Sequence, residues 1–458
     1  MITLDLLIPV CALVAAVLSL FLVEKYRGGT RWVGVSTLFA ASMLGGYLFP
    51  LVPYLEGTDY HSISYPTAVD VERSVGSALW LAAMGAAAFA LGWTVISRRK
   101  QRPVGVFVPT VLRRHHFRAF SILLTLFGLG LFALGVVAAG GVNAVLEGLN
   151  DRVRAFEGLN YLFQSIYLLL AVALVWFARL LGDPQPLWQQ RMFWLYLLVT
   201  FVLMGSLGNK STIFVAVVAF VVMYDEGRKR IGVLVAAISG CSLILAIIAY
   251  GLIARQYLVS GAIVTITDWD VESIWKLIEL EMGGHLIQLQ MLTLLVDRMP
   301  GTLDWQYGLT LLSLLTMPIP RAIWPDKLLP ATGPVTEAFY PGLRELWGTT
   351  IPPGMIGEFF MNFGLIGVPV GMFLAGAGYA ILRKRWLRRR NTSSLIAYAF
   401  MLALLPHYVR GELVSPTILF LVIFIPASFL LRVAKVESHG GRSAPRPAKP
   451  LGEQSEGR

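Results

Sequence analysis

The stretch GEFFMNFGLIGVPVGMFLAGAGYAILRKRWLRRR, residues 357–390, carries the two signals that decide the fold. The part from 357 to 382 is almost wholly apolar, and a helix of about 20 such residues crosses the hydrocarbon layer of a bilayer. The cluster RKRWLRRR at 383–390 then ends the apolar run. Lys and Arg concentrate in the cytoplasmic loops of membrane proteins, so this end of the span is expected in the cytoplasm.

The rest of the chain repeats this pattern. Of its 458 residues 56% are hydrophobic and only 14% are charged, and the mean hydropathy is +0.68. Apolar runs of membrane-spanning length predict an all-α, polytopic membrane bundle of about eleven transmembrane helices. The expected spans lie near 4–23, 33–53, 78–97, 119–139, 161–181, 192–207, 211–224, 232–253, 357–382, 393–409 and 415–434. The sixth and seventh are short and separated only by GNK, so a single re-entrant hairpin is an alternative there.

The net charge of +11 does not indicate a nucleic-acid partner, because the cations gather in short connections between apolar runs. SRRKQR and LRRHHFR, within 97–118, follow the third span as RKRWLRRR follows the ninth. The positive-inside rule then places the N-terminus outside and the C-terminus in the cytoplasm. Cys11 and Cys241 both lie inside apolar runs and imply neither a disulfide nor a metal site.

Four regions follow from this topology. Residues 1–253 form eight spans with short loops, 254–356 one long external segment, 357–434 three further spans, and 435–458 a disordered cytoplasmic tail. A connection of this length is normally functional. DWDVESIWKLIELE (268–281) and HLIQLQMLTLLVDRMP (285–300) predict two amphipathic helices against the outer membrane face or over the bundle. In the ninth span, Gly367, Gly371 and Ala375 form a small-residue face for helix packing.

The external segment continues with MPIPRAIWPDKLLPATGP, residues 317–334. Its prolines fix the backbone and are expected to hold Arg321 and Lys327 in place at low entropic cost. Preorganised cations of this kind suit a phosphate-bearing ligand. An ordinary surface loop with interfacial aromatic anchors is the alternative interpretation.

Other polar residues are expected on the same outer face, against the positive-inside trend, and charges at a membrane face indicate function. The candidate anion-binding cations are Arg154, Lys210, Arg255, Arg321, Lys327 and Arg410, and the candidate acid–base residues are Glu358, His285, His407 and Glu412. Two of the cations, Lys210 and Arg255, have an alternative role as interfacial anchors, and Glu358 has one at a helix N-terminus. The chain has no nucleotide-binding motif and no metal-ligand spacing, so we expect no cofactor and no metal. A lipid-linked phosphate or pyrophosphate fits these cations, which would stabilise the charge of a leaving group.

Three fragments resemble one known family. IPRAIWPDK (319–327) followed by PPGMIGEFFMNFGLIGVPVGMFLAGAGY (352–379), GGVNAVLEGLNDRVRAFEGLNY (140–161) and RGE (410–412) resemble the oligosaccharide repeat-unit polymerases, the O-antigen polymerase family. The resemblance runs from about residue 119 onward. The family usually has an arginine in a GSR tip where this chain has GSLGNK (205–210), and Lys210 cannot replace its bidentate contact.

The resemblance implies a metal-independent glycosyltransferase of the C-type fold in a bacterial cytoplasmic membrane. Such an enzyme moves a glycan from one undecaprenyl-pyrophosphate carrier to a sugar hydroxyl on another, at the outer face. By position, Arg154, Arg255, Arg321 and Arg410, with Lys327 beside them, would engage the pyrophosphates. The implied partners are the lipid-linked oligosaccharide, membrane lipids, a chain-length regulator and a flippase.

Three other functions stay open. A transporter or flippase of lipid-linked glycans predicts internal repeats, broken helices and charges deep within spans. A ligase of the same fold shares the donor chemistry and differs only in its acceptor. A non-catalytic structural membrane protein is the third alternative.

Overall fold

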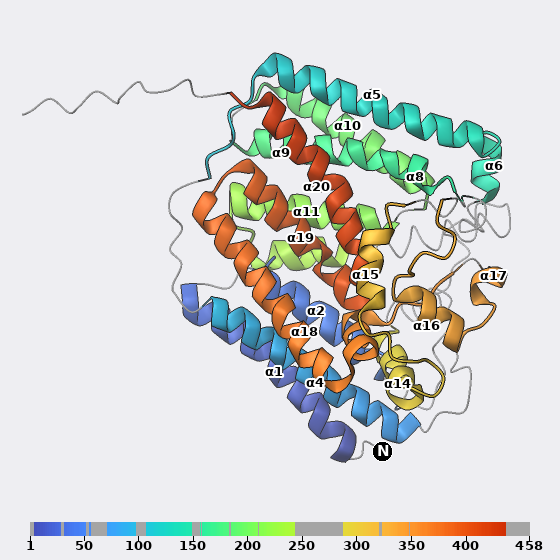
Figure 1. The fold of residues 1–458 in the computed structure, drawn as a ribbon. Helices are drawn as coiled ribbons and strands as arrows, with labels where there is room; N and C mark the ends of the chain where they lie inside the picture. Colours follow the sequence, from blue (N-terminus) through green and yellow to red (C-terminus); the bar gives the residue numbers. More distant parts are fainter. Residues whose placement is uncertain are drawn as a thin grey trace, which may run out of the picture.

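The computed structural model describes residues 4–28, 32–51, 55, 71–97, 107–148, 156, 158–182, 185–208, 210–242, 287–319, 323–347 and 349–436. In these residues the regular elements are all helices (Figure 1). The long helices are α1 (Leu4–Gly28), α2 (Val35–Tyr47), α4 (Val71–Ile96), α5 (Arg114–Ala138), α9 (Tyr167–Gly182), α10 (Leu187–Ser206), α11 (Lys210–Gly227), α18 (Gly354–Arg389), α19 (Thr392–Arg410) and α20 (Val414–Ala434). The shorter ones are α6 (Val142–Glu147), α8 (Asn160–Phe163), η2 (Gln164–Ile166), α14 (Gln288–Arg298), α15 (Leu309–Thr316), α16 (Thr332–Phe339) and α17 (Leu343–Trp347).

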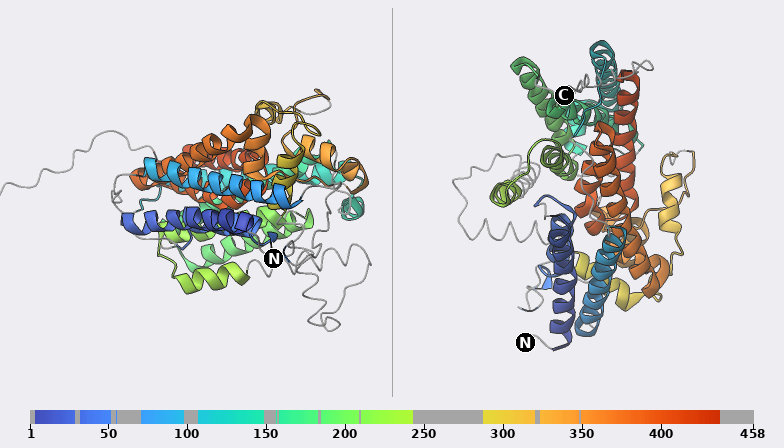
Figure 2. Two further views of the ribbon diagram at one scale, coloured as in Figure 1. Left: turned by 90° about the horizontal axis from the view of Figure 1, so that it is seen from below. Right: turned by 90° about the vertical axis from the view of Figure 1, so that its left-hand side faces the viewer.

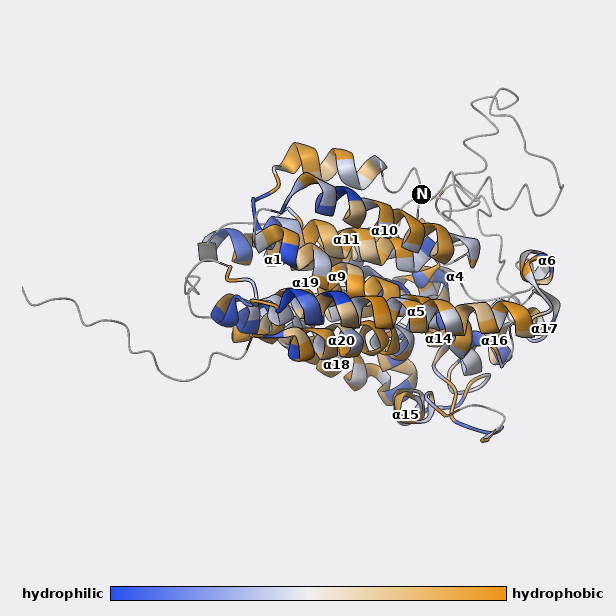
Figure 3. Ribbon diagram, turned by 90° about the horizontal axis from the view of Figure 1, so that it is seen from above, coloured by the Kyte–Doolittle hydropathy of each residue, from blue (hydrophilic) through white to orange (hydrophobic). Residues whose placement is uncertain are grey.

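The architecture is that of a polytopic membrane bundle. Seven helices among the described residues are long and apolar enough to cross a membrane, and two shorter apolar helices, Val35–Tyr47 and Val233–Ser242, accompany them. A helix lies at every predicted span, the eighth being described only as far as Ser242. Figure 3 shows hydrophobic residues along the helices and hydrophilic ones at the left-hand end, where α5 begins.

The sixth and seventh predicted spans, for which a re-entrant hairpin was the alternative, correspond to two separate helices. The two helices, α10 and α11, have 20 and 18 residues, and an α-helix of 18 residues is about 27 Å long. The far end of α11 reaches the opposite end of the bundle, where Trp386 Nε1 donates to Glu226 Oε2 at 2.8 Å. The two helices are separate elements of the bundle, and neither is among the seven described helices that are long and apolar enough to cross a membrane.

The most extensive helix contact joins α4 and α18, which lie side by side in Figures 1 and 2. Glycines on both helices make it possible. A Cβ atom on Gly92 would lie 2.1 Å from the carbonyl oxygen of Phe373, and one on Gly376 would lie 2.1 Å from that of Phe89. The two backbones are thus in direct contact, as small residues allow between membrane helices.

Helix α18 is broken at Gly364, whose φ of 64° and ψ of −154° suit glycine alone. The chain folds back here. A Cβ on Gly367 would meet the Phe359 carbonyl oxygen at 2.5 Å, and one on Gly371 would meet the Phe359 ring at 2.4 Å. The predicted small-residue face at Gly367 and Gly371 therefore packs against the first turns of its own helix.

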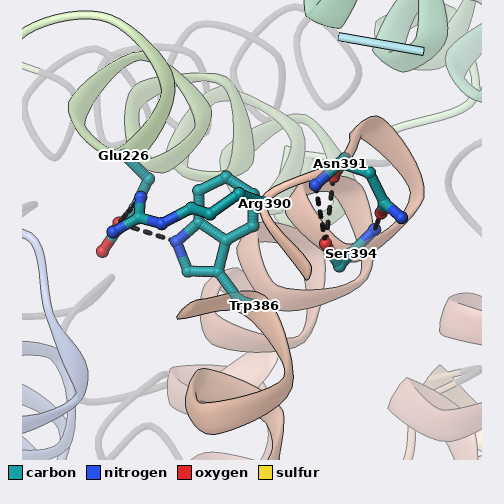
Figure 4. A network of polar contacts seen from close by, with 5 residues as sticks. All are labelled: Glu226, Trp386, Arg390, Asn391 and Ser394. Atoms are coloured by element: carbon teal, nitrogen blue, oxygen red, sulfur yellow. Dashed lines mark hydrogen bonds and ion pairs between the residues drawn. The ribbon is translucent and has the colours of Figure 1, made fainter. Parts of the chain in front are cut away.

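One end of the bundle, which we call the basic end, holds the C-termini of α1, α11 and α18 and the N-terminus of α19. Glu24 accepts a hydrogen bond from Arg383 Nη1 at 2.8 Å, and the Arg383 guanidinium lies over the Trp93 ring. The guanidinium of Arg390 lies over the Trp386 ring, 4.7 Å from its centroid, and 3.8 Å from Glu226 Oε2 (Figure 4). Both acids are buried, while cations such as Arg388, Arg389 and Arg432 are exposed.

Helix α18 ends in this same network. Arg390 adopts a left-handed conformation and donates its backbone N–H to the Trp386 carbonyl oxygen. Asn391 then begins α19 with a capping box, in which its side chain accepts from Ser394 N at 3.0 Å and Ser394 Oγ accepts from Asn391 N (Figure 4). The turn between the ninth and tenth spans is thus fixed by local hydrogen bonds.

The second predicted amphipathic helix packs against the bundle, one of its two predicted positions, and is buried more deeply than a helix on the outer membrane face would be. It corresponds to α14, in which every residue from Gln288 to Leu295 is buried, and it packs on α2, α4 and α18. Ser74 Oγ donates to Asp297 Oδ1 at 2.7 Å and ties α14 to α4. The polar side chains of α14 lie inside the protein because the bundle covers them. The first predicted helix, 268–281, lies outside the described residues.

Candidate functional site

The end of the bundle opposite the basic end, which we call the site end, holds the N-terminus of α18, the C-terminus of α19 and the N-terminus of α20. Glu358 lies at its centre, in the first turns of α18, and is completely buried. Its Oε1 accepts from Thr310 Oγ1 at 3.1 Å, and its Oε2 accepts from the backbone N–H of Leu413 at 2.6 Å. One carboxylate therefore joins α15, α18 and the start of α20.

Asn362, one turn further along α18, extends this network. Its amide nitrogen donates to Thr310 Oγ1 at 2.7 Å and to the carbonyl oxygen of Glu358 at 2.8 Å. Its Oδ1 accepts from the backbone N–H of Gly308 at 2.8 Å, and Gly308 has a φ of 88° just before α15 begins. Because Thr310 Oγ1 accepts from Asn362, its hydroxyl proton points to Glu358. Each of these hydrogen bonds pairs a donor with an acceptor. A buried polar network whose groups are paired in this way is rigid.

Glu412 holds the turn between α19 and α20 and is also buried. Its Oε2 accepts from the backbone N–H of Thr332, at the start of α16, at 2.8 Å, and its Oε1 accepts from Ser415 Oγ. The neighbouring Gly411 carbonyl oxygen accepts from Gly354 N at 2.8 Å. This turn is therefore anchored to both α16 and the beginning of α18.

His407 and Arg410 lie one helical turn apart near the end of α19, on the same face and half-buried. The backbone here is held from two sides, because Gly411 N donates to the His407 carbonyl oxygen at 2.8 Å and Gln288 Nε2 donates to that of Arg410 at 3.4 Å. Of the four predicted acid–base residues, His407 is the only described one that keeps part of its side chain exposed.

Lys327 lies inside the proline-rich stretch and is buried. Its ammonium group donates to the carbonyl oxygens of Met317 at 3.1 Å and Ile319 at 2.6 Å. Tyr161 donates its hydroxyl to the same Met317 carbonyl at 2.9 Å. The lysine thus ties together the segment that the prolines were predicted to brace.

Lys210 is the first residue of α11 and is half-buried. Helix α11 packs antiparallel on α19, so Lys210 lies at the same end of the bundle as Arg410. The structure thus brings Lys210, Lys327, Glu358, His407, Arg410 and Glu412 to one end. The other four predicted site residues, Arg154, Arg255, His285 and Arg321, lie outside the described residues.

Sequence reasoning missed Thr310, Asn362 and Gln288. Asn362 follows Glu358 by four residues inside an apolar run, and this spacing places both on one face of a helix. The pair Glu358 and Asn362 could therefore have indicated the buried polar network from the sequence. Thr310 belongs to LTLLSLLT, where polar residues recur every third position. Gln288 carries no such signal, because only the packing of α14 into the bundle brings it to Arg410.

The arrangement combines two kinds of group. The carboxylates of Glu358 and Glu412 each receive hydrogen bonds on both oxygens, so they hold elements together. The imidazole and guanidinium on α19 are half-buried, and groups of these types can accept a proton and bind an anion. No cluster of three or more His, Cys, Asp or Glu side chains able to hold a metal ion occurs in the described ranges.

The fold and the site define a polytopic helical membrane protein with a polar cluster at one end of its bundle. Comparison of the sequence with protein-family models and curated proteins, and of the chain with solved structures, found no match.

Proposed function

We propose that this protein is a membrane glycosyltransferase that polymerises undecaprenyl-pyrophosphate-linked oligosaccharide repeat units. The observation that carries the proposal is the pair His407 and Arg410, on one half-buried face of α19 at the site end. The exposed cations of the opposite end favour a cytoplasmic location for that end, which would put the pair at the outer face. The resemblance of IPRAIWPDK and RGE to the polymerase family is a second support.

In the proposed reaction the acceptor sugar hydroxyl attacks the anomeric carbon of the donor glycan. A new C–O bond forms there, and the bond from that carbon to the pyrophosphate oxygen breaks. Arg410 binds the pyrophosphate that leaves with the bonding electrons, and a fixed cation stabilises the developing charge. His407 accepts the proton of the hydroxyl. Glu358, one of the four acid–base candidates on sequence grounds, has donors on both oxygens and acts instead as a positioning residue.

The test uses the purified full chain in liposomes supplied with carrier-linked repeat units, with the ladder of elongated products as the readout. Arg410→Ala is expected to reduce elongation on the order of 100-fold or more. Arg410→Lys should recover only part of it, because lysine cannot make a bidentate contact. Arg389→Ala is the matched control, since Arg389 is an exposed cation at the basic end.

Arg321→Ala tests the role predicted for that arginine in the same assay, and loss of elongation is the expected result. Wild-type elongation by a correctly folded Arg410→Ala variant would refute the role of Arg410. The absence of any ladder with every acceptor mixture would refute polymerisation, and transfer to a different acceptor lipid or protein would identify a ligase.

One observation favours a second candidate, a transporter or flippase of lipid-linked glycans. Transporters commonly use discontinuous helices, and α18 is broken at Gly364 with the buried Glu358 just before the break. Liposomes containing a fluorescent lipid-linked glycan would distinguish the two functions. Translocation across the bilayer without elongation supports the transporter, whereas elongation without translocation supports the polymerase.

A further inference from the structure

Helix α15 has its polar residues inside and its apolar residues outside. In LTLLSLLT, Thr310, Ser313 and Thr316 are buried. The leucines on the other face are exposed, Leu312 by 51% and Leu315 by 74%. A helix on the surface of a soluble domain has the reverse arrangement, with its apolar stripe toward the core.

The buried polar face has a defined role. Thr310 donates to Glu358 and accepts from Asn362, and Ser313 Oγ donates to the Thr310 carbonyl oxygen at 2.6 Å. Thr316 Oγ1 donates in turn to the carbonyl oxygen of Ser313 at 3.1 Å. The polar side of α15 therefore covers the Glu358 network and is satisfied there.

The exposed leucine face continues the outer surface of the membrane-spanning helices. Helix α15 contacts both α18 and α20, and it lies at the edge of the bundle in the right-hand view of Figure 2, in yellow-orange. Ile366 and Leu374 of α18 and Ile425 of α20 are likewise exposed. On helices of membrane-spanning length and apolar composition, such residues form the surface that faces the lipid.

The chain carries an exposed aromatic residue on each side of α15. Tyr307 precedes α15 and Trp324 follows it, and both are exposed. Tyr and Trp concentrate at the level of the lipid headgroups. The helix has 8 residues, about 12 Å, and is too short to cross the hydrocarbon layer. Interfacial aromatics on both sides of so short a helix are expected for a segment that enters the membrane and returns on the same side.

We propose that α15 is a re-entrant, membrane-embedded helix whose Leu309, Leu312 and Leu315 face contacts the hydrocarbon of the bilayer, while its polar face seals the Glu358 network from the lipid. The partner of this surface is the acyl region of one leaflet. Non-spanning helical segments occur at membrane depth where their polar groups are buried in protein, as those of α15 are. This inference does not depend on the reaction that the protein catalyses.

Spin labels at single cysteines test the proposal on the full chain reconstituted in liposomes. Cys11 and Cys241 are first replaced by serine, and cysteine is then introduced at Leu312 or at Leu315. Collision of the label with molecular oxygen reports lipid, and collision with a water-soluble nickel chelate reports water. Ile366→Cys on α18 is the lipid-facing control, and Glu345→Cys on α17, whose side chain is exposed, is the water-facing control.

The labels at 312 and 315 are expected to match Ile366→Cys, with frequent oxygen collisions and a nickel-chelate collision rate several-fold below that of Glu345→Cys. A nickel-chelate rate equal to that of Glu345→Cys would show that α15 is in water and overturn the proposal. Low rates for both reagents would show that protein, such as a second copy of this chain, covers the leucine face, and this too would overturn it. Elution of each variant at the wild-type position in size exclusion shows that the fold is retained.

Discussion

Replacing Gly376 by alanine is expected to force α4 and α18 apart. A Cβ atom on Gly376 would lie 2.1 Å from the carbonyl oxygen of Phe89, and Gly92 approaches α18 equally closely from the other side. The obstructing atom belongs to the backbone of a helix, so no side-chain rotation relieves the clash. The most extensive helix contact of the bundle must therefore open.

The magnitude follows from the distances. Real Cβ atoms essentially never approach another heavy atom closer than 3.0 Å, so the helices must separate by at least 3.0 − 2.1 = 0.9 Å at this point. Overpacking a well-packed interior costs up to about 3 kcal/mol, and the better helix propensity of alanine returns about 1 kcal/mol. With an unfolding entropy of about 2.1 cal/mol/K per residue over 458 residues, the net loss of about 2 kcal/mol corresponds to a fall in Tm of about 2 °C.

The assay is thermal melting of the purified protein in detergent. Its readout is the fraction that still elutes as a folded monodisperse peak after heating to each temperature. Gly378→Ala is the matched control, because Gly378 lies on the same helix two residues later and has no heavy atom within 4 Å of its Cβ position. That variant should melt at or slightly above the wild-type temperature. An unchanged Tm for Gly376→Ala, or an equal fall for Gly378→Ala, would refute the packing argument.

Two further changes test hydrogen bonds at the two ends of the bundle. Trp386→Phe removes the indole N–H that donates to the buried Glu226 carboxylate. This change should destabilise the fold by about 1.5–3 kcal/mol in the same melting assay. The control is Trp194→Phe, at an exposed tryptophan, and an effect of Trp386→Phe no larger than that of the control would contradict the prediction. Lys327→Met removes both hydrogen bonds to the Met317 and Ile319 carbonyls and should speed limited proteolysis between residues 317 and 334. A cleavage rate equal to that of the wild type would show that the prolines alone hold the segment.

The positions of the long helices could be predicted because each apolar run near the thickness of a bilayer gives one. What the periodicity does not reveal is the partner of each face. The pattern of α14 predicted an amphipathic helix on the outer membrane face or over the bundle, and it did not predict that Gln288 and Gln290 are buried. Their burial depends on α2, α4 and α18, which are distant in the sequence. In the same way, the sequence placed residues 309–316 in the long external segment and did not predict that the leucine face of α15 points outward.

The candidate site was predictable where its residues lie at the ends of spans. Glu358, His407, Arg410 and Glu412 all lie at or next to an end of the last three predicted helices, so a consistent topology brings them to one end. Their individual roles were not predictable. Glu358 receives donors from Thr310 and Leu413, and the sequence distances of 48 and 55 residues conceal both contacts.

The break at Gly364 bears on the choice between a polymerase and a transporter. A transporter helix that is broken to work as a moving gate needs two arrangements of the segments beside the break. Here the segment before the break is fixed on both sides. The Phe359 ring packs on Gly371, and the Asn362 side chain bonds to Gly308 and Thr310. Moving it would leave buried polar groups without partners, at a cost of about 1–3 kcal/mol each. A segment held in this way suits a preorganised site, in which fixed groups act on a bound substrate, better than an alternating one.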